Sequence, residues 1–99
     1  MYQVTLGFPR EEQFGLTSQM RRAAASIASN IVEGSGRDSK ADYIRFLDMA
    51  YGSARELEYQ ISLAARLGYL PSNDAESLHA AADETSKVLN GLLRALRAG

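Results

Sequence analysis

Apolar side chains recur at alternating spacings of four and three along the middle of the chain. They follow Ser39 and occupy Tyr43, Leu47, Ala50, Ala54, Leu57, Ile61 and Ala64. This spacing keeps the side chains on one face of an α-helix, and its persistence is typical of helices that pack side by side. Ser39 suits an N-cap, whereas Gly68 and Pro71 favour termination. The pattern therefore predicts a long helix over residues 40–68.

The C-terminal third of the chain repeats the alternating spacings of four and three. Its stripe consists of Leu78, Ala82, Thr85, Leu89, Leu92 and Leu96. Asn73 and Glu76 have the spacing of a capping box, in which each side chain binds a backbone N–H at the start of a helix. The pattern predicts a helix over residues 73–97, which Gly91 weakens by about 1 kcal/mol relative to alanine.

An earlier stripe predicts a helix over residues 16–33 and consists of Met20, Ala24, Ile27 and Ile31. Gly34 is expected to be its C-cap, because glycine adopts the left-handed conformation that other residues resist. The stretch up to Ser39 then forms the corner between two helices. A phosphate-binding loop is the alternative, but it would need a preceding strand and a Gly-Lys-Ser/Thr ending, and the sequence has neither.

Length and composition favour a single all-α domain over residues 1–99. A chain of 99 residues supports one modest core, and its content of Ala, Leu, Glu and Arg favours helices. Cysteine is absent and His79 is the single histidine, so neither disulfides nor a His/Cys metal site are expected. Glu76 and His79 form one Glu-x-x-His motif, whereas a di-iron bundle needs two. We expect no cofactor, no metal and no enzymatic activity.

The net charge and the hydropathy of the chain bear on whether it binds nucleic acid or a membrane. The formal net charge of −1 argues against a surface built for non-specific binding of nucleic acid. A local basic patch is still a hypothesis, with possible nucleic-acid contacts at Arg21, Arg22, Arg37, Lys40 and Arg45. No apolar run reaches the roughly 18 residues of a membrane span, and the N-terminus does not resemble a signal peptide. We therefore expect a cytoplasmic protein without membrane contact.

Two further features have more than one interpretation. Asn30 and Glu33 share a helix face next to Gly34 and Arg37, and they form either a ligand pocket or a structural polar corner. We favour a structural polar corner made by Asn30, Glu33 and Gly34. Gly52 lies within a predicted helix, where it lowers stability unless a close backbone contact compensates. That contact lies either within the subunit, which we favour, or between subunits.

Several short motifs occur together along the chain. They are Phe14-Gly15-Leu16 with Gln19, Arg22-Ala23-Ala24 with Ser26-Ile27, Asn30-Ile31, Glu33-Gly34, Phe46-Leu47, Gly52-Ser53, Glu56-Leu57 and Gly68-Tyr69-Leu70. In this combination the chain resembles, from about Phe8 to its C-terminus, the bacterial four-helix-bundle proteins called 23S ribosomal RNA intervening-sequence proteins. A similar branch serves diversity-generating retroelements as an accessory protein that binds nucleic acid and the reverse transcriptase.

The resemblance implies an all-α, antiparallel up-down four-helix bundle that assembles into a homopentamer and has no catalytic residues. The family's first helix is long, whereas residues 1–7 supply only its final turn, so we expect a truncated first helix. We expect a non-catalytic oligomeric protein with a role in assembly or interaction. The alternative is an adaptor that binds RNA or DNA through the local basic patch, although this chain is less basic than the retroelement branch.

Overall fold

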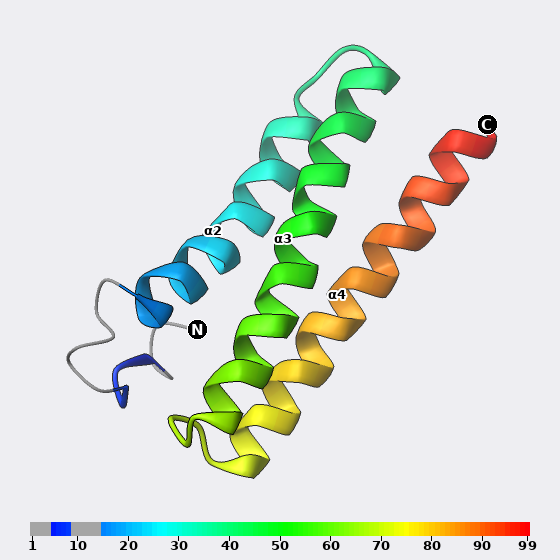
Figure 1. The fold of residues 1–99 in the computed structure, drawn as a ribbon. Coiled ribbons are helices and arrows are strands. Elements are labelled where there is room, and N and C mark those ends of the chain that lie inside the picture. Colours follow the sequence, from blue (N-terminus) through cyan, green and yellow to red (C-terminus); the bar gives the residue numbers. More distant parts are fainter. Residues whose placement is uncertain (1–4, 9–14) are drawn as a thin grey trace.

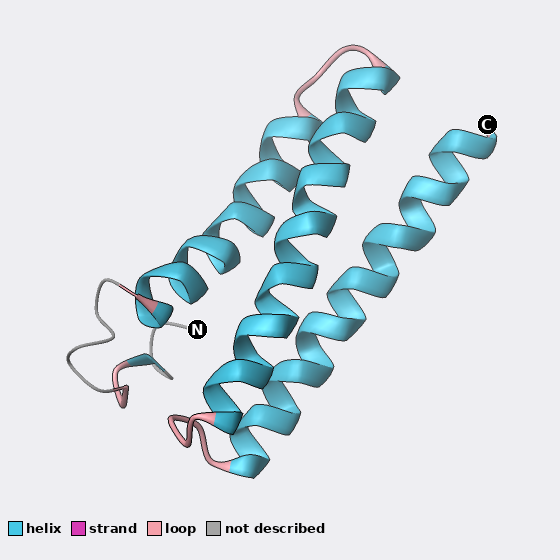
Figure 2. Cartoon of the chain, viewed as in Figure 1, coloured by secondary structure: helices cyan, strands magenta, loops and turns pink. Residues whose placement is uncertain are grey.

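The computed structural model describes residues 5–8 and 15–99, and within these it contains three α-helices. They are α2 (Leu16–Ser35), α3 (Lys40–Arg66) and α4 (Ser72–Ala98) (Figure 1). No strand occurs in these described residues, so the predicted all-α class is confirmed (Figure 2). Residues 5–8 form a turn in which the N–H of Phe8 donates to the carbonyl of Thr5 over 3.1 Å. The remainder of the expected first-helix remnant, residues 1–4, lies outside the described residues.

The three helices lie in a row with α3 in the middle, antiparallel to both neighbours (Figure 1). Helix α3 packs against α2 on one side and against α4 on the other. In the described chain, no Cα atom of α2 comes within 8 Å of a Cα atom of α4. The result is an elongated layer with overall dimensions of 45 × 22 × 16 Å.

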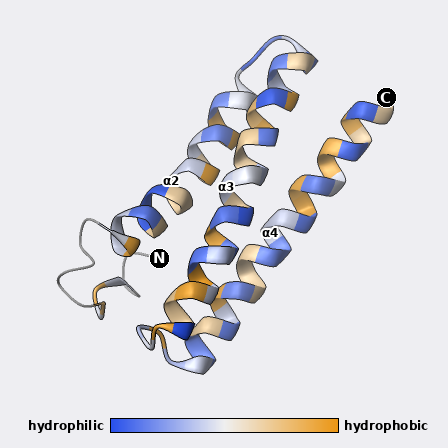
Figure 3. Ribbon diagram, viewed as in Figure 1, coloured by the Kyte–Doolittle hydropathy of each residue, from blue (hydrophilic) through white to orange (hydrophobic). Residues whose placement is uncertain are grey.

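The inner face of α3 carries the core of the protein. All six positions of the predicted stripe from Leu47 to Ala64 are at most 7% exposed, which confirms the predicted helical face. One cluster joins this face to Met20 of α2 and Ala75 of α4, and a second joins it to Leu89 of α4. Hydrophobic and hydrophilic residues alternate along all three helices, as amphipathic helices require (Figure 3). Because burying one aliphatic side chain stabilises by about 1.5–3 kcal/mol, Leu47, Leu57 and Ile61 on this face contribute to the stability of the fold.

The buried face of α4 differs from the predicted stripe near the C-terminus. Leu92 was expected in the core but is 37% exposed, whereas Leu93 is 2% exposed. Ser86 is likewise buried in place of Thr85, which is half-buried. A helix turns by about 100° per residue, so the buried residues of α4 fall within one arc of about 60°, and they are Ala75, Ala82, Ser86, Leu89 and Leu93. Leu92 and Thr85 lie outside this arc, because the buried face is centred to one side of the predicted stripe.

Both ends of α3 follow the signals in the sequence. The backbone N–H of Asp42 donates to the hydroxyl of Ser39 over 3.0 Å, which confirms Ser39 as the N-cap. At the other end, the helix stops at Arg66, two residues before the predicted end. Gly68 has a φ of +80° and closes a Schellman motif with the carbonyl groups of the last turn. Only glycine adopts this backbone conformation without strain.

The start of α4 contradicts the predicted capping box. The helix begins at Ser72, Pro71 occupies the N-cap position, and no side chain caps this helix in the described structure. Asn73 therefore lies inside the first turn and not at the N-cap, from which its side chain was expected to bind the free N–H groups. Pro71 has a φ of −58°, and its carbonyl accepts the N–H of Ala75 over 3.0 Å. The fixed φ of proline prepares this start without a side-chain cap.

Gly34 is not the C-cap of α2, contrary to the sequence prediction. The helix continues to Ser35, and Gly36 takes the cap position with a φ of −89°. Gly34 is buried in the last turn, where an added Cβ would lie 2.8 Å from the Cβ of Phe46 and 3.1 Å from a ring carbon of Tyr43. Glycine is therefore required here because α2 and α3 approach closely, and its backbone conformation is an ordinary helical one.

Replacing Gly34 by alanine should lower the free energy of unfolding by about 1–2 kcal/mol. The added methyl group overpacks the α2–α3 contact by about 1–3 kcal/mol, and improved helix propensity offsets up to about 1 kcal/mol of that loss. Urea denaturation followed by circular dichroism measures the change. Gly36→Ala is the matched control, since its Cβ would meet only the carbonyl of Glu33 at 3.7 Å. Equal stability of the two variants would contradict the steric role of Gly34.

Candidate functional site

The five predicted basic contacts do not form one patch. Arg37, Lys40 and Arg45 lie at the corner between α2 and α3 or in the first turns of α3. Arg21 and Arg22 lie in the second turn of α2. The rise of a helix places them about 20 Å from the end of α2 where the corner begins. The structure therefore divides the predicted patch into two separate groups.

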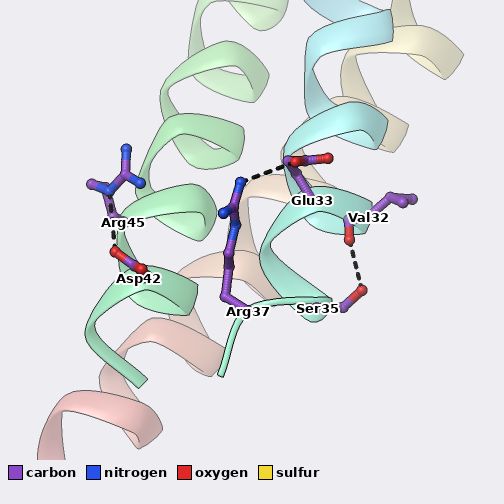
Figure 4. A network of polar contacts seen from close by, with 6 residues as sticks. All are labelled: Val32, Glu33, Ser35, Arg37, Asp42 and Arg45. Atoms are coloured by element: carbon purple, nitrogen blue, oxygen red, sulfur yellow. Dashed lines mark hydrogen bonds and ion pairs between the residues drawn. The ribbon is translucent and has the colours of Figure 1, made fainter. Parts of the chain in front are cut away.

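At the corner, two of the cations are held by neighbouring side chains (Figure 4). A guanidinium nitrogen of Arg37 lies 3.0 Å from Glu33, and Nε of Arg45 lies 3.6 Å from Asp42. Both guanidinium groups also cover the ring of Phe46, at 4.8 and 4.6 Å from its centroid. Exposed ion pairs and cation–π contacts of this kind each contribute about 0–1 kcal/mol. The corner thus carries compensated charge, and its cations shield an aromatic ring of the core.

The C-terminal end of α4 lies close to the same corner. Arg97 forms an ion pair with Asp48 of α3, which joins the last turn of α4 to the central helix. The ammonium group of Lys40 lies next to Gly99, where it would be 3.7 Å from an added Cβ. This end of the layer therefore combines residues from all three helices.

The basic pair on α2 has a different environment. Nε of Arg21 donates to the hydroxyl of Thr5 over 2.7 Å, and this hydrogen bond ties the turn at residues 5–8 to α2. Thr5 is buried beneath this contact. Arg22 is exposed and lines a small cavity between α2 and α3. The two arginines therefore serve different contacts, although they are adjacent in the sequence.

The predicted polar corner also divides into separate contacts. The side-chain amide of Asn30 donates to the carbonyl of Ser26 over 2.9 Å and to its hydroxyl over 3.0 Å. The hydroxyls of Ser26 and Ser53 are 2.9 Å apart, so this chain of hydrogen bonds links α2 to α3. Glu33 instead pairs with Arg37 at the surface, and Gly34 marks the close approach of the two helices.

A small cavity of about 120 Å³ adjoins this chain of hydrogen bonds. It is lined by Gln19, Arg22, Ala23, Ser26, Ser53 and Glu56. Below it, the amide nitrogen of Gln60 donates to Glu56 over 3.1 Å, while the amide oxygen of Gln60 is buried without a partner among the described residues. The cavity holds both charges, and its walls combine polar side chains with the apolar Ala23. Sequence reasoning missed it because its residues come from two helices.

The opposite seam, between α3 and α4, holds the most buried charge in the described chain. The carboxylate of Glu58 is 7% exposed, pairs with Arg55 over 3.1 Å and accepts the hydroxyl of Ser86 over 3.4 Å. Arg55 and Glu58 are three residues apart, a spacing typical of surface ion pairs, but here the carboxylate is buried while the guanidinium group is exposed. A buried ion pair offsets its desolvation only when both partners remain in place, so Glu58 depends on Arg55.

A groove runs along this seam on the outside of the layer. Its polar part, of about 300 Å³, is lined by Arg55, Glu58, Tyr59, Ser62, His79 and Asp83. An adjoining part of about 360 Å³ continues over Ile61, Ala65, Ala75 and Ala80 and is mostly apolar. The hydrogen bond from Lys87 lowers the pKa of the Asp83 carboxyl, and the same contact raises the pKa of Lys87. Both groups are exposed, so solvent screens this pair.

No group of three or more His, Asp or Glu side chains within residues 5–8 and 15–99 has an arrangement that could hold a metal ion. His79 lies in the groove beside Asp83, where it belongs to no such group. Among the helices described, none is both long and apolar enough to cross a bilayer.

Comparison with known proteins identifies the family of this chain. The family model described as 23S rRNA-intervening sequence protein matches residues 1–91. No curated protein matches the sequence. The chain is similar to a protein of unknown function from the S23 ribosomal protein family of Bacteroides thetaiotaomicron VPI-5482, whose crystal structure is known. The two are 29% identical, the TM-score is 0.83, and the match covers 93% of this chain and 83% of that chain.

The motifs that carry the resemblance also meet in space, because Gln19, Ser26, Ser53 and Glu56 line one cavity between α2 and α3. A family match over nine-tenths of the chain and a close structural neighbour of the same family agree with this arrangement. The chain therefore belongs to the 23S rRNA-intervening sequence protein family.

Proposed function

We propose that this chain is a non-catalytic assembly protein that associates with further copies of itself. The observation that carries the proposal is the open layer of helices. Apolar side chains of α2 and α4 are exposed, with Val32 at 70% and Val88 at 62%. Each is one helical turn from another apolar residue of the same helix, Ala28 or Leu92. Exposed apolar side chains of this kind favour burial against another protein surface.

We further propose that the three helices belong to an up-down four-helix bundle with a truncated first helix. In such a bundle the first helix packs between the second and the fourth. Helices α2 and α4 are separated in the described structure, and Ile31 and Leu92 are exposed at the edge of the core. The structural neighbour is the longer chain, since the match covers 83% of it. A first helix packed between α2 and α4 would cover these side chains.

The number of copies is proposed from the family resemblance, which implies a homopentamer. Five copies close into a ring only if two different faces of the chain meet, because a contact between two identical faces stops at a dimer. An elongated layer with two distinct flat sides meets this requirement. The polar cavity and the outer groove would then serve contacts between subunits, with no reaction taking place there.

An adaptor that binds RNA or DNA is the second candidate, as in the retroelement branch that the sequence resembles. Arg37, Lys40 and Arg45 lie within nine residues of one another at one end of the layer, which favours a small phosphate-binding surface. Glu33 and Asp42 compensate two of these charges, and the net charge of the chain is −1. Self-association therefore explains the described surface better than binding to a polyanion.

Light scattering coupled to size-exclusion chromatography should give an oligomer, with five times the 10.8 kDa mass of one chain as the expected value. Exposed apolar edges favour this state at micromolar concentrations. The measurement should be repeated over a tenfold dilution, so that weak association is detected. A mass of one chain throughout would contradict the proposed assembly.

Gel shifts with single-stranded and duplex RNA and DNA should show no complex at about 50 mM salt and micromolar protein. The compensated charges at the corner are the physical reason for this expectation. A complex that weakens steeply with added salt, and that is lost in a Lys40→Ala/Arg45→Ala variant, would instead support the adaptor. Arg66→Ala/Lys87→Ala is the matched control, because it removes two positive charges away from the corner, at the far end of α3 and in the middle of α4.

A further inference from the structure

The cavity between α2 and α3 brings together polar groups whose hydrogen-bonding capacity the chain does not use. Its volume is about 120 Å³, and α3 contributes Ser53 and Glu56 to its lining. Ser53 follows Gly52, where the sequence favours a close contact within the subunit. That prediction is wrong, because an added Cβ at Gly52 would meet no atom within 4 Å in the described chain. The close approach of the two helices lies at Gly34 instead, whereas the seam beside Ser53 holds a cavity.

The antiparallel packing of α2 and α3 decides which side chains face each other across this cavity (Figure 1). The hydroxyls of Ser26 and Ser53 are 2.9 Å apart, which fixes the register of the two helices. Arg22 lies one turn before Ser26, and Glu56 lies one turn after Ser53, so both are on the same side of this contact. The cavity therefore has two hydroxyls at one end and opposite charges on its two walls at the other.

Arg22 and Glu56 do not neutralise each other. Arg22 makes no hydrogen bond or ion pair with any residue in the described part of the chain. Glu56 accepts one hydrogen bond, from the amide nitrogen of Gln60 over 3.1 Å, whereas a carboxylate can accept several. Both charges are thus available to a ligand that carries charges of both signs.

The two serines add a hydrogen-bond donor to the cavity. A hydroxyl group has one hydrogen and two acceptor lone pairs. The hydroxyl of Ser26 accepts a hydrogen bond from Asn30 and shares a second one with the hydroxyl of Ser53. Whichever serine donates in that contact, the hydrogen of the other has no acceptor among the described residues. This O–H group lies in the wall of the cavity, where it suits an oxygen atom of a carboxylate.

Gln60 shows unused acceptor capacity beside Glu56. Its amide oxygen is buried without a partner in the described chain, and the whole residue is only 3% exposed. Its amide nitrogen is held by Glu56, so this hydrogen bond fixes which way the amide is turned. Because a buried acceptor without a donor destabilises a structure, an end of the cavity with two such acceptors suits an ammonium group.

The volume of the cavity limits the size of the ligand. An apolar protein cavity of about 150 Å³ holds a molecule of about six non-hydrogen atoms. A cavity of about 120 Å³ therefore suits a molecule of about five or six such atoms. Glycine and alanine have this size and carry a carboxylate and an ammonium group.

We propose that the cavity between α2 and α3 binds a small zwitterion of the α-amino acid class. The carboxylate lies along the α2 wall, between the guanidinium group of Arg22 and the serine hydroxyls, and the ammonium group pairs with Glu56. Guanidinium groups bind carboxylates through two parallel hydrogen bonds, which orients the ligand. All the lining residues belong to one chain, so this binding role goes beyond the proposed assembly and does not require it.

An NMR titration of the isotope-labelled protein with glycine and alanine tests the site, up to about 20 mM because ligands of this size bind at about millimolar strength. We expect saturable shifts of the amide signals of Ser26 and Ser53. Acetate and methylammonium each carry half of the ligand, and they should bind about tenfold more weakly, or weaker still, because each loses one charged contact. If neither glycine nor alanine gives saturable shifts at these serines, the cavity holds only water and the proposal is overturned.

Arg22→Gln and Glu56→Gln test the two charges separately. Each variant keeps an amide in place of the charged group, and each should weaken binding by about tenfold while circular dichroism shows unchanged helix content. Glu84→Gln and Arg94→Gln are the matched controls, because both positions are exposed on α4 and lie outside the cavity. They should leave binding unchanged.

Binding that persists at full strength in either cavity variant would overturn the zwitterion site, as would an equal loss in the control variants. The mass of the protein in solution separates this outcome from the proposed assembly. An oligomer that binds no zwitterion would overturn the site alone, and a monomer that binds one would overturn the assembly alone.

Discussion

Contact with α3 holds this structure together, because α3 alone packs against both other helices along their backbones in the described chain. Its inner face is built from alanines and aliphatic residues, which let α2 and α4 approach and then fill the space between them. Gly34 brings α2 closest, and a single added methyl group would collide with Phe46 there. The two clusters of the core both include residues of this central helix.

The same dependence explains which expectations from the sequence succeeded. The stripe of α3, its N-cap at Ser39 and its end near Gly68 were predictable, because each depends on neighbours within a few residues. The role of Gly34 was not, since a C-cap and a close approach use the same residue and only the position of Phe46 distinguishes them. The burial of Leu93 in place of Leu92 was not predictable either, because the position of α3 decides on which side of the apolar stripe the buried face of α4 is centred.

The candidate sites were less predictable because they are assembled across helices. The five basic residues were grouped by their charge, yet the length of α2 separates Arg21 and Arg22 from the corner. Asn30 was expected to join Glu33, but its amide bonds to Ser26, and Ser53 of α3 completes the contact. Burial of Glu58 depends on Ser86, which lies 28 positions later. Spacing within one helix carries no information about such partners.

The described surface of this family member has two seams between helices, where the carboxylates of Glu56 and Glu58 have partners. It also has exposed apolar side chains beside these seams. The most direct test is hydroxyl-radical footprinting with mass spectrometry, in which the labelling rates of Val32 and Val88 are followed as protein concentration rises. Self-association predicts that these exposed side chains become protected, while the fully buried Met20 stays unlabelled throughout. Labelling of Val32 and Val88 that stays at the rate expected of exposed side chains at every concentration would contradict the account.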